Sequence, residues 1–161
     1  MKGKLVQLNI SQGGIPKKPI PEGKVTFDRV EGDSWRYPSH GGRTAAVCLF
    51  SNELIEELNK DGHTLFPGAV GENFTTEGLD YHQIKIGDMF QVGDEVQIRI
   101  TMNRVPCSNL DIYGKGLQEK LYDKEVKNGN VETPKWGKSG FKCEVVKEGL
   151  VRPGDVIIKI E

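Results

Sequence analysis

Apolar and polar residues alternate along several short stretches of the chain, with the period of two that β-strands show. Residues 4–10 alternate in this way, and Val6, Leu8 and Ile10 are predicted to share one face. The run 44–50 is continuously apolar, so we expect a strand that is buried on both faces. The same reasoning predicts further strands at 25–30, 73–76, 83–86, 89–92, 95–102, 140–147 and 156–160.

Helical spacing occurs twice. After Ser51 or Asn52, either of which can cap a helix, three apolar residues recur at helical intervals: Leu54, Ile55 and Leu58. A second, weaker helix is predicted from Leu117, Leu121 and Val126. About eight or more short strands with two helices indicate a mainly β fold, a closed or nearly closed β-barrel. No linker or repeat divides the chain, so we expect a single domain over residues 1–161.

Composition narrows the function classes. The chain has 161 residues, 36% of them hydrophobic and 28% charged, with 22 basic and 23 acidic residues and a net charge of -1. This balance argues against a nucleic-acid partner, because the protein has no overall cationic field. No apolar stretch is long enough to cross a membrane, and the first ten residues lack a signal-peptide core, so we expect a cytoplasmic protein without membrane contact.

The three cysteines differ in their surroundings. Cys48 and Cys143 lie within apolar strand patterns and are expected to pack as small core residues. Cys107 follows Pro106 in a polar loop, where Arg104 could favour the thiolate that binds metals or attacks electrophiles. From the residues alone, a functional thiol and a loop cysteine without a role remain equally open. The count is odd and there is no C-x-x-C pair, which argues against a disulfide framework or a zinc clamp.

Two loops pair glycines with a cation, a combination that can surround an oxyanion. One is 11–17, which ends at Lys17, and the other is 40–43, which ends at Arg43. A tight surface turn is the alternative for each. In a third loop, Glu72 and Asn73 bring a carboxylate and an amide to the start of a strand, with a solvated charge and a turn residue as the alternative.

Other candidate side chains are weaker. His63 and His82 have no ligand partner at a characteristic spacing and are expected to face solvent, and Trp35 and Trp136 are expected to pack. The usual signatures of nucleotide binding and nucleophilic hydrolysis are absent.

Read in order, the short motifs form a series. They are Ser11-x-Gly13-Gly14-x-Pro16-Lys17, Gly32-Asp33, His40-Gly41-Gly42-Arg43, Gly71-Glu72-Asn73-Phe74, Arg104-x-Pro106-Cys107 and Gly149-x-Val151-x-x-Gly154-Asp155. This series resembles the MOSC domain, named for the C-terminal part of molybdenum-cofactor sulfurases, over about residues 5–160. The resemblance implies a barrel related to that of pyruvate kinase.

The resemblance also implies a site for the molybdenum cofactor, a molybdopterin that carries the metal. Cys107 would ligate molybdenum, because a soft thiolate suits that metal. The residues implied to hold the cofactor are Lys17, Gly41, Gly42, Arg43, Asn73 and Arg104, with the three cations on the pterin phosphate. Pyridoxal phosphate is not expected, because the desulfurase domain that binds it in full sulfurases has no counterpart here.

Two main functions follow from the resemblance. The first is an oxidoreductase that reduces small N-hydroxylated compounds, with Cys107, Glu72 and His40 as catalytic residues and an external electron-donor protein as partner. Glu72 or His40 would supply the protons that leave as water. The second is a non-catalytic carrier that receives, sulfurates or transfers the cofactor or activated sulfur, with a cysteine desulfurase and apo-molybdoenzymes as partners. A third possible function is that of a protein-interaction domain whose barrel has lost its cofactor. Within the family, the chain resembles a minimal stand-alone member.

Overall fold

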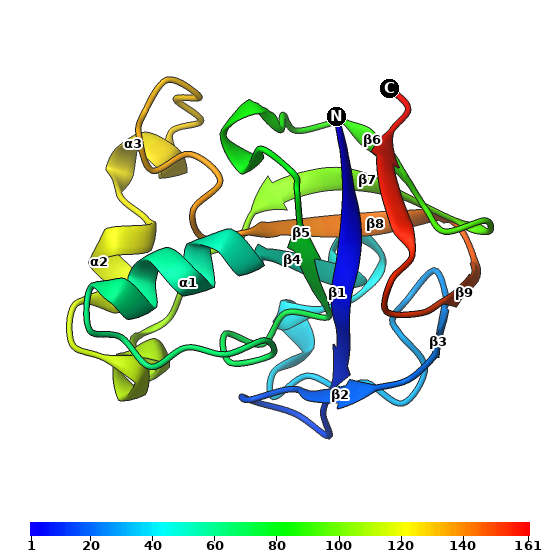
Figure 1. Ribbon diagram of the computed structural model, residues 1–161, viewed down its shortest axis with the longest axis horizontal. Helices are drawn as coiled ribbons and strands as arrows, with labels where there is room; N and C mark the ends of the chain where they lie inside the picture. The colour runs from blue at the N-terminus through cyan, green and yellow to red at the C-terminus, as the bar shows by residue number, and fades with distance from the viewer.

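Seven strands close into a β-barrel, as the sequence pattern predicts (Figure 1). The computed structural model describes residues 1–161. Around the barrel the strands are β10 (Val156–Lys159), β6 (Met89–Val92), β7 (Val96–Asn103), β8 (Phe141–Lys147), β4 (Val47–Ser51), β5 (Phe74–Glu77) and β1 (Lys2–Ile10). The barrel closes where β1 pairs antiparallel with β10, so the first and last strands of the chain lie side by side.

Three short strands lie outside the closed barrel. β2 (Lys18–Ile20) pairs with the end of β1 at the edge of the sheet, where its proline is tolerated. β3 (Gly23–Val25) pairs with β9 (Gly149–Val151) in a separate ribbon. The ribbon connects loops from opposite ends of the chain at one rim of the barrel.

The predicted first helix is confirmed as α1 (Asn52–Lys60), which lies against the outside of the barrel (Figure 1). The Ser51 hydroxyl caps it by accepting a hydrogen bond from the Leu54 amide at 3.2 Å. α1 connects β4 to β5, which run parallel, whereas the other barrel pairs are antiparallel. A parallel pair needs such a crossover, because a tight turn only joins antiparallel neighbours.

The predicted second helix is two shorter ones, α2 (Leu117–Leu121) and α3 (Lys124–Lys127). The chain is extended at Tyr122, and Asp123 then starts α3 by accepting a hydrogen bond from the Val126 amide at 3.0 Å. The local capping group therefore interrupts a spacing that is otherwise helical.

Two separate apolar clusters stabilise the fold. The larger fills the barrel, and the smaller lies between the barrel wall and the segments that carry α1 and α2. β4 contributes to both, since Leu49 belongs to the inner cluster and Phe50 to the outer one. The expectation that this strand is buried on both faces is therefore correct for these residues.

Two predicted strands, 4–10 and 25–30, differ from the structure in register or in length. The register between β1 and β5 shifts between Leu5 and Gln7, so the fully buried apolar residues of β1 are Leu5 and Leu8 rather than the alternating set that includes Val6. The stretch predicted as a strand at 25–30 turns back after Val25, which bridges Val30.

The stretch 83–86 is not a strand. It follows the 3-10 helix η3 (Tyr81–Gln83), which Asp80 caps by accepting a hydrogen bond from the His82 amide at 3.1 Å. The carbonyl of Ile84 accepts a hydrogen bond from the buried Trp136 indole at 2.7 Å instead of joining a ladder.

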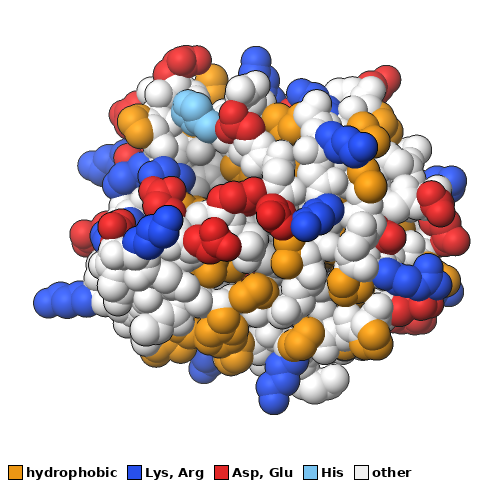
Figure 2. Space-filling view, in the orientation of Figure 1, with side chains coloured by type: hydrophobic (Ala, Val, Ile, Leu, Met, Phe, Trp, Pro, Cys, Tyr) orange, Lys and Arg blue, Asp and Glu red, His pale blue; other side chains and the backbone are white.

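The surface carries no single sign of charge. On the face shown in Figure 2, acidic and basic side chains are intermingled, which agrees with the near-zero net charge. No helix has both the length and the apolar content that a bilayer crossing requires.

The inner cluster predicts a large penalty for truncating Ile98, which is fully buried in β7. Ile98→Ala should lower the free energy of unfolding by about 2–5 kcal/mol, because the cavity cannot refill. Gln97→Ala, at the neighbouring half-buried position, should change it by about 0.5 kcal/mol or less. Urea unfolding followed by circular dichroism measures both, and equal losses would mean that the barrel interior does not dominate stability.

Candidate functional site

Loops that are far apart in the sequence meet at one end of the barrel. The Lys17 amide donates to the Gly68 carbonyl at 2.9 Å, which brings the 11–17 loop onto the turn before β5. The Arg104 guanidinium, just after β7, donates to the Val70 carbonyl in that same turn. The structure therefore brings Lys17, Arg104 and the Glu72–Asn73 segment together.

The Asp33 carboxylate is the centre of this arrangement and is fully buried. Its Oδ1 accepts hydrogen bonds from the Lys17 ammonium at 2.6 Å and from the Ser11 amide at 2.9 Å. Its Oδ2 accepts a hydrogen bond from the Asn73 side-chain amide at 3.0 Å. Lys17 is itself only 7% exposed, so its charge is balanced by Asp33 and its direct role is to hold the loops together.

Asn73 connects two strands through both ends of its side chain. Its Oδ1 accepts a hydrogen bond from the Cys48 amide at 3.1 Å, and its Nδ2 also donates to the Asn9 carbonyl at 3.1 Å. Together with the bond to Asp33, these contacts use all the polar groups of the side chain. Asn73 is thus engaged within the protein.

Glu72 is completely buried, so the alternative of a solvated charge is wrong. Its Oε1 accepts hydrogen bonds from the Gly68 amide at 2.6 Å and from the Thr75 hydroxyl at 2.7 Å, whereas Oε2 has no partner. Burial raises the pKa of Glu72, although these hydrogen bonds and the charge of Arg104 act in the opposite direction. The carboxyl group therefore holds its proton to a higher pH than an exposed glutamate.

Arg104 also has one unsatisfied group. Its backbone amide donates to the Gly140 carbonyl at 2.9 Å, and Nη2 bonds Val70, but the buried Nη1 has no partner. Gly71 has φ +88°, and a Cβ there would lie 3.0 Å from the Ile15 side chain and 3.7 Å from Arg104 Nη2. A glycine at this position lets the loop and the arginine approach each other.

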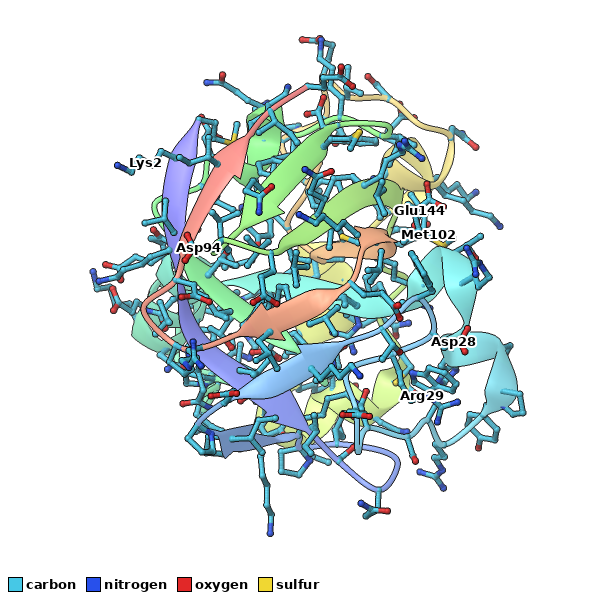
Figure 3. The ribbon with its side chains drawn as sticks, turned by 90° about the vertical axis from the view of Figure 1, so that its right-hand side faces the viewer. Lys2, Asp28, Arg29, Asp94, Met102 and Glu144 are labelled. Atoms are coloured by element: carbon cyan, nitrogen blue, oxygen red, sulfur yellow. The ribbon has the colours of Figure 1, made fainter.

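The segment with His40 lies over β7 and β8. It forms two 3-10 helices, η1 (Pro38–His40) and η2 (Arg43–Ala45), and the Thr101 hydroxyl donates to the Thr44 carbonyl at 2.6 Å. Figure 3 views the molecule from this side, with Met102 of β7 and Glu144 of β8 labelled beside the cyan 36–45 segment. Burial, together with the charges of Lys142 and Arg104, lowers the pKa of His40.

Gly41, Gly42 and Arg43 lie in the same segment. A Cβ on Gly41 would overlap the Trp35 ring, so this position requires glycine for packing. Gly42 has φ +95° and open space where a Cβ would be. Arg43 is exposed and stacks 5.0 Å from the centre of the Phe27 ring.

Cys107 is exposed at the N-cap position of the 3-10 helix η4 (Ser108–Tyr113). Cys143 is buried in the barrel interior, as expected, and burial raises its pKa. Cys48 is half-buried and belongs to neither apolar cluster, so its expected core position is wrong. Burial raises the pKa of Cys48, while Arg104 and Lys142 act in the opposite direction.

Sequence reasoning missed Lys142 and gave Asp33 no role. Asp33 has one sequence signal, its place in the ordered motif series, whereas nothing near Lys142 marks it as functional. His63 was expected to face solvent but is buried, because the turn after α1 packs against Gly114.

No three His, Cys, Asp or Glu side chains gather as a metal cage, so a metal would rely on few protein ligands. Two surface pockets, of about 390 and 600 Å³, are lined by residues of α1 and the 134–138 segment. Neither includes a residue of this site.

Residues 36–158 match the family model of the MOSC domain. The chain is 32% identical over 146 residues to the uncharacterized protein YflK of Bacillus subtilis (strain 168), which covers 88% of this chain and 60% of YflK. It is 28% identical over 136 residues to a protein named "Reductase" of Gibberella moniliformis, covering 82% of this chain and 22% of that one. The chain thus spans 60% or less of these curated relatives.

Solved structures have the same fold. The structure of YiiM from Geobacillus stearothermophilus aligns with a TM-score of 0.72 at 23% identity, covering 99% of this chain and 75% of that one. The YuaD protein from Bacillus subtilis aligns with a TM-score of 0.69 at 18% identity, covering 98% and 94%.

The buried pair predicts that Asp33→Asn strongly destabilises the protein. The Lys17 ammonium would lose its counter-charge while remaining buried, which should lower the free energy of unfolding by about 3–5 kcal/mol. As a control, Lys4→Gln removes the pair with Glu77, whose side chains are 56% and 45% exposed, and should cost about 1 kcal/mol or less. Chemical denaturation measures both, and a loss at Asp33 no larger than at Lys4 would show that the network does not hold the loops.

Proposed function

The chain belongs to the MOSC domain family, and from that premise we propose that it binds a molybdenum cofactor through Cys107 and reduces small N-hydroxylated compounds. The observation that carries the proposal is an exposed thiol three residues after Arg104, whose Nη1 is buried without a partner. A soft ligand and an unused cationic donor thus occur in one short segment.

The residues present suit such a cofactor. A single thiolate is enough where the cofactor brings the other ligands of the metal, so the lack of a histidine or carboxylate cage is no obstacle. The anionic end of the cofactor needs a cation, and Arg104 Nη1 is a buried donor without a partner. Gly42, with open space at its Cβ position, allows a ligand to approach its backbone closely.

When bound, the cofactor would supply the two-electron redox chemistry that reduction of an N–OH group requires. The chain would supply the metal ligand and the rigid surroundings: Cys107 would hold the metal, and the loops bonded to Asp33 would hold the site residues in position. Reduction of N–OH to N–H releases water, so protons are needed. The chain has no iron–sulfur cysteine spacing, so we also propose an external electron-donor protein.

Glu72 suits proton delivery better than His40. The raised pKa of Glu72 keeps its carboxyl group protonated to a higher pH, and its Oε2 has no partner to compete for that proton. The lowered pKa of His40 makes its imidazole neutral near pH 7, when it has no acidic proton to give. We therefore assign the proton to Glu72 Oε2. The name of the Gibberella relative, a reductase, supports the reaction class.

The metal role of Cys107 predicts the metal content of the Cys107→Ala variant. Purified from a host that makes the cofactor, the variant should contain at least about tenfold less molybdenum than wild type, because a direct ligand is lost. Cys143→Ala, which removes a buried thiol, is the control and should retain metal and pterin. Metal analysis and pterin fluorescence measure the two.

The outcomes separate the candidate functions. Wild-type protein that never acquires molybdenum or pterin would contradict the proposal. Loaded protein that shows no turnover with a hydroxylamine and a strong chemical donor, yet passes its cofactor to an apo-enzyme, would establish a carrier instead.

The proton role predicts that Glu72→Gln slows turnover on the order of 10²–10⁴-fold while metal content stays unchanged. His40→Ala, as the comparison, should slow it far less. Wild-type turnover should fall as pH rises through the raised pKa of Glu72, because the acid form is lost, and the variant should lack that fall. A wild-type fall that persists in Glu72→Gln would assign the proton to another group.

A further inference from the structure

Two cations without a carboxylate partner lie together on the outer face of the barrel. They are Arg104, just after β7, and Lys142, in β8. We propose that Arg104 and Lys142 form a binding site for an oxyanion of the phosphate-monoester or carboxylate class. The site rests on the proposed function only for the source of the anion, since its chemistry requires no metal.

Lys142 lies in the middle of a row of three outward residues. In the sheet register it is opposite Cys48 on one side and Met102 on the other, whereas the next residue, Cys143, points into the barrel and is fully buried. Because neighbouring residues of a strand point to opposite faces, Lys142 points outward. Its ammonium donates to the His40 carbonyl at 3.3 Å, which directs it toward the 36–45 segment.

Arg104 provides the second, independent observation. Its Nη1 is buried but has no hydrogen-bond partner, although Nη2 of the same guanidinium does. A buried donor without a partner is costly, so such groups mark places where a ligand or water completes the bonding. In the ladder between β7 and β8, Met102 is opposite Lys142, and the Arg104 amide donates to the Gly140 carbonyl at 2.9 Å, so the two cations arise from neighbouring positions. The charge of Arg104 also contributes to lowering the pKa values of Lys142 and His40, which agrees with this placement.

No carboxylate pairs with these two cations. Arg99, close by in β7, pairs with Glu144, and Lys17 pairs with Asp33, but neither Arg104 nor Lys142 forms an ion pair. Residues 34–46, which include the segment that the Lys142 ammonium contacts, contain no Asp or Glu. Burial lowers the pKa of Lys142 most, Cys48 acts in the opposite direction, and the like charge of Arg104 lowers this pKa further through repulsion. An anion would remove this repulsion.

The two side chains suit an oxyanion in different ways. A guanidinium presents planar donors that match the oxygens of a phosphate or carboxylate, and an ammonium adds a point charge. Of the three cations that the sequence suggested for an anion, this arrangement retains Arg104. Lys17 is neutralised by Asp33, and Arg43 is exposed on the Phe27 ring. The anion would be either the terminal phosphate of the cofactor or an acidic group of a free small molecule.

Calorimetric titration of the cofactor-free protein with inorganic phosphate tests the site. Wild type should bind, and Lys142→Gln should raise the dissociation constant by about tenfold or more, because a charge-assisted contact is lost. Lys142→Arg should restore much of the affinity. Lys147→Gln, an exposed lysine of the same strand, is the matched control and should bind as wild type does.

A measurement on wild type avoids dependence on folded variants. Phosphate should slow acylation of Lys142 but not of Lys147, mapped by mass spectrometry. Absence of phosphate binding, unchanged affinity in Lys142→Gln, or an equal loss in Lys147→Gln would overturn the site.

The source of the anion is settled by repeating the titration on cofactor-loaded protein. Lost phosphate binding assigns the site to the cofactor phosphate, and retained binding assigns it to a free anion. Because phosphate binding is measured without metal, the site can be confirmed even if Cys107 proves not to bind molybdenum, and the two failures are distinguishable.

Discussion

The buried carboxylate of Asp33 is the interaction on which the site depends. An ionised group can be buried only when opposite charge and hydrogen bonds replace its water shell. Asp33 meets this condition with the ammonium of Lys17, the backbone of Ser11 and the amide of Asn73. Two partners come from the 11–17 loop and the third from the start of β5, so the buried charge of Asp33 joins its own loop to two other segments.

This network leaves a clear division among the polar groups of the site. Lys17 and Asn73 form the frame, since their side chains are bonded within the protein. Glu72 Oε2 and Arg104 Nη1 lie against that frame without partners. Glu72 Oε2 can accept a hydrogen bond or carry a proton, and Arg104 Nη1 can donate a hydrogen bond. Both groups remain available to a substrate or cofactor, because no residue of the frame bonds them.

The barrel makes this division possible through the alternation of its strands. In β4 and β8 the inward residues, Leu49 and Cys143, fill the interior, while Cys48 and Lys142 point outward. A barrel wall with a full core on one side can place reactive groups on the other at little cost to stability. The similarity to YiiM and YuaD structures, at 23% and 18% identity, shows that this scaffold tolerates wide sequence change.

The features that can be predicted from the amino-acid sequence are local in origin. The cap at Ser51 with three spaced apolar residues predicts α1, alternation predicts β6, β7 and β8, and the position of Cys107 after Pro106 predicts an exposed thiol. The ordered motifs identified the family, and the family implied the barrel. None of these inferences requires knowing which loops touch.

The remaining features are properties of the folded chain. The register shift in β1, the burial of Glu72, the partnership of Lys17 with Asp33 and the exposure of Lys142 beside Arg104 depend on contacts between distant segments. The sequence does not distinguish a charged residue that faces water from one that is buried against a partner. Its environment is set by closure of the barrel, because closure determines which loops share one rim and which charges must neutralise each other there.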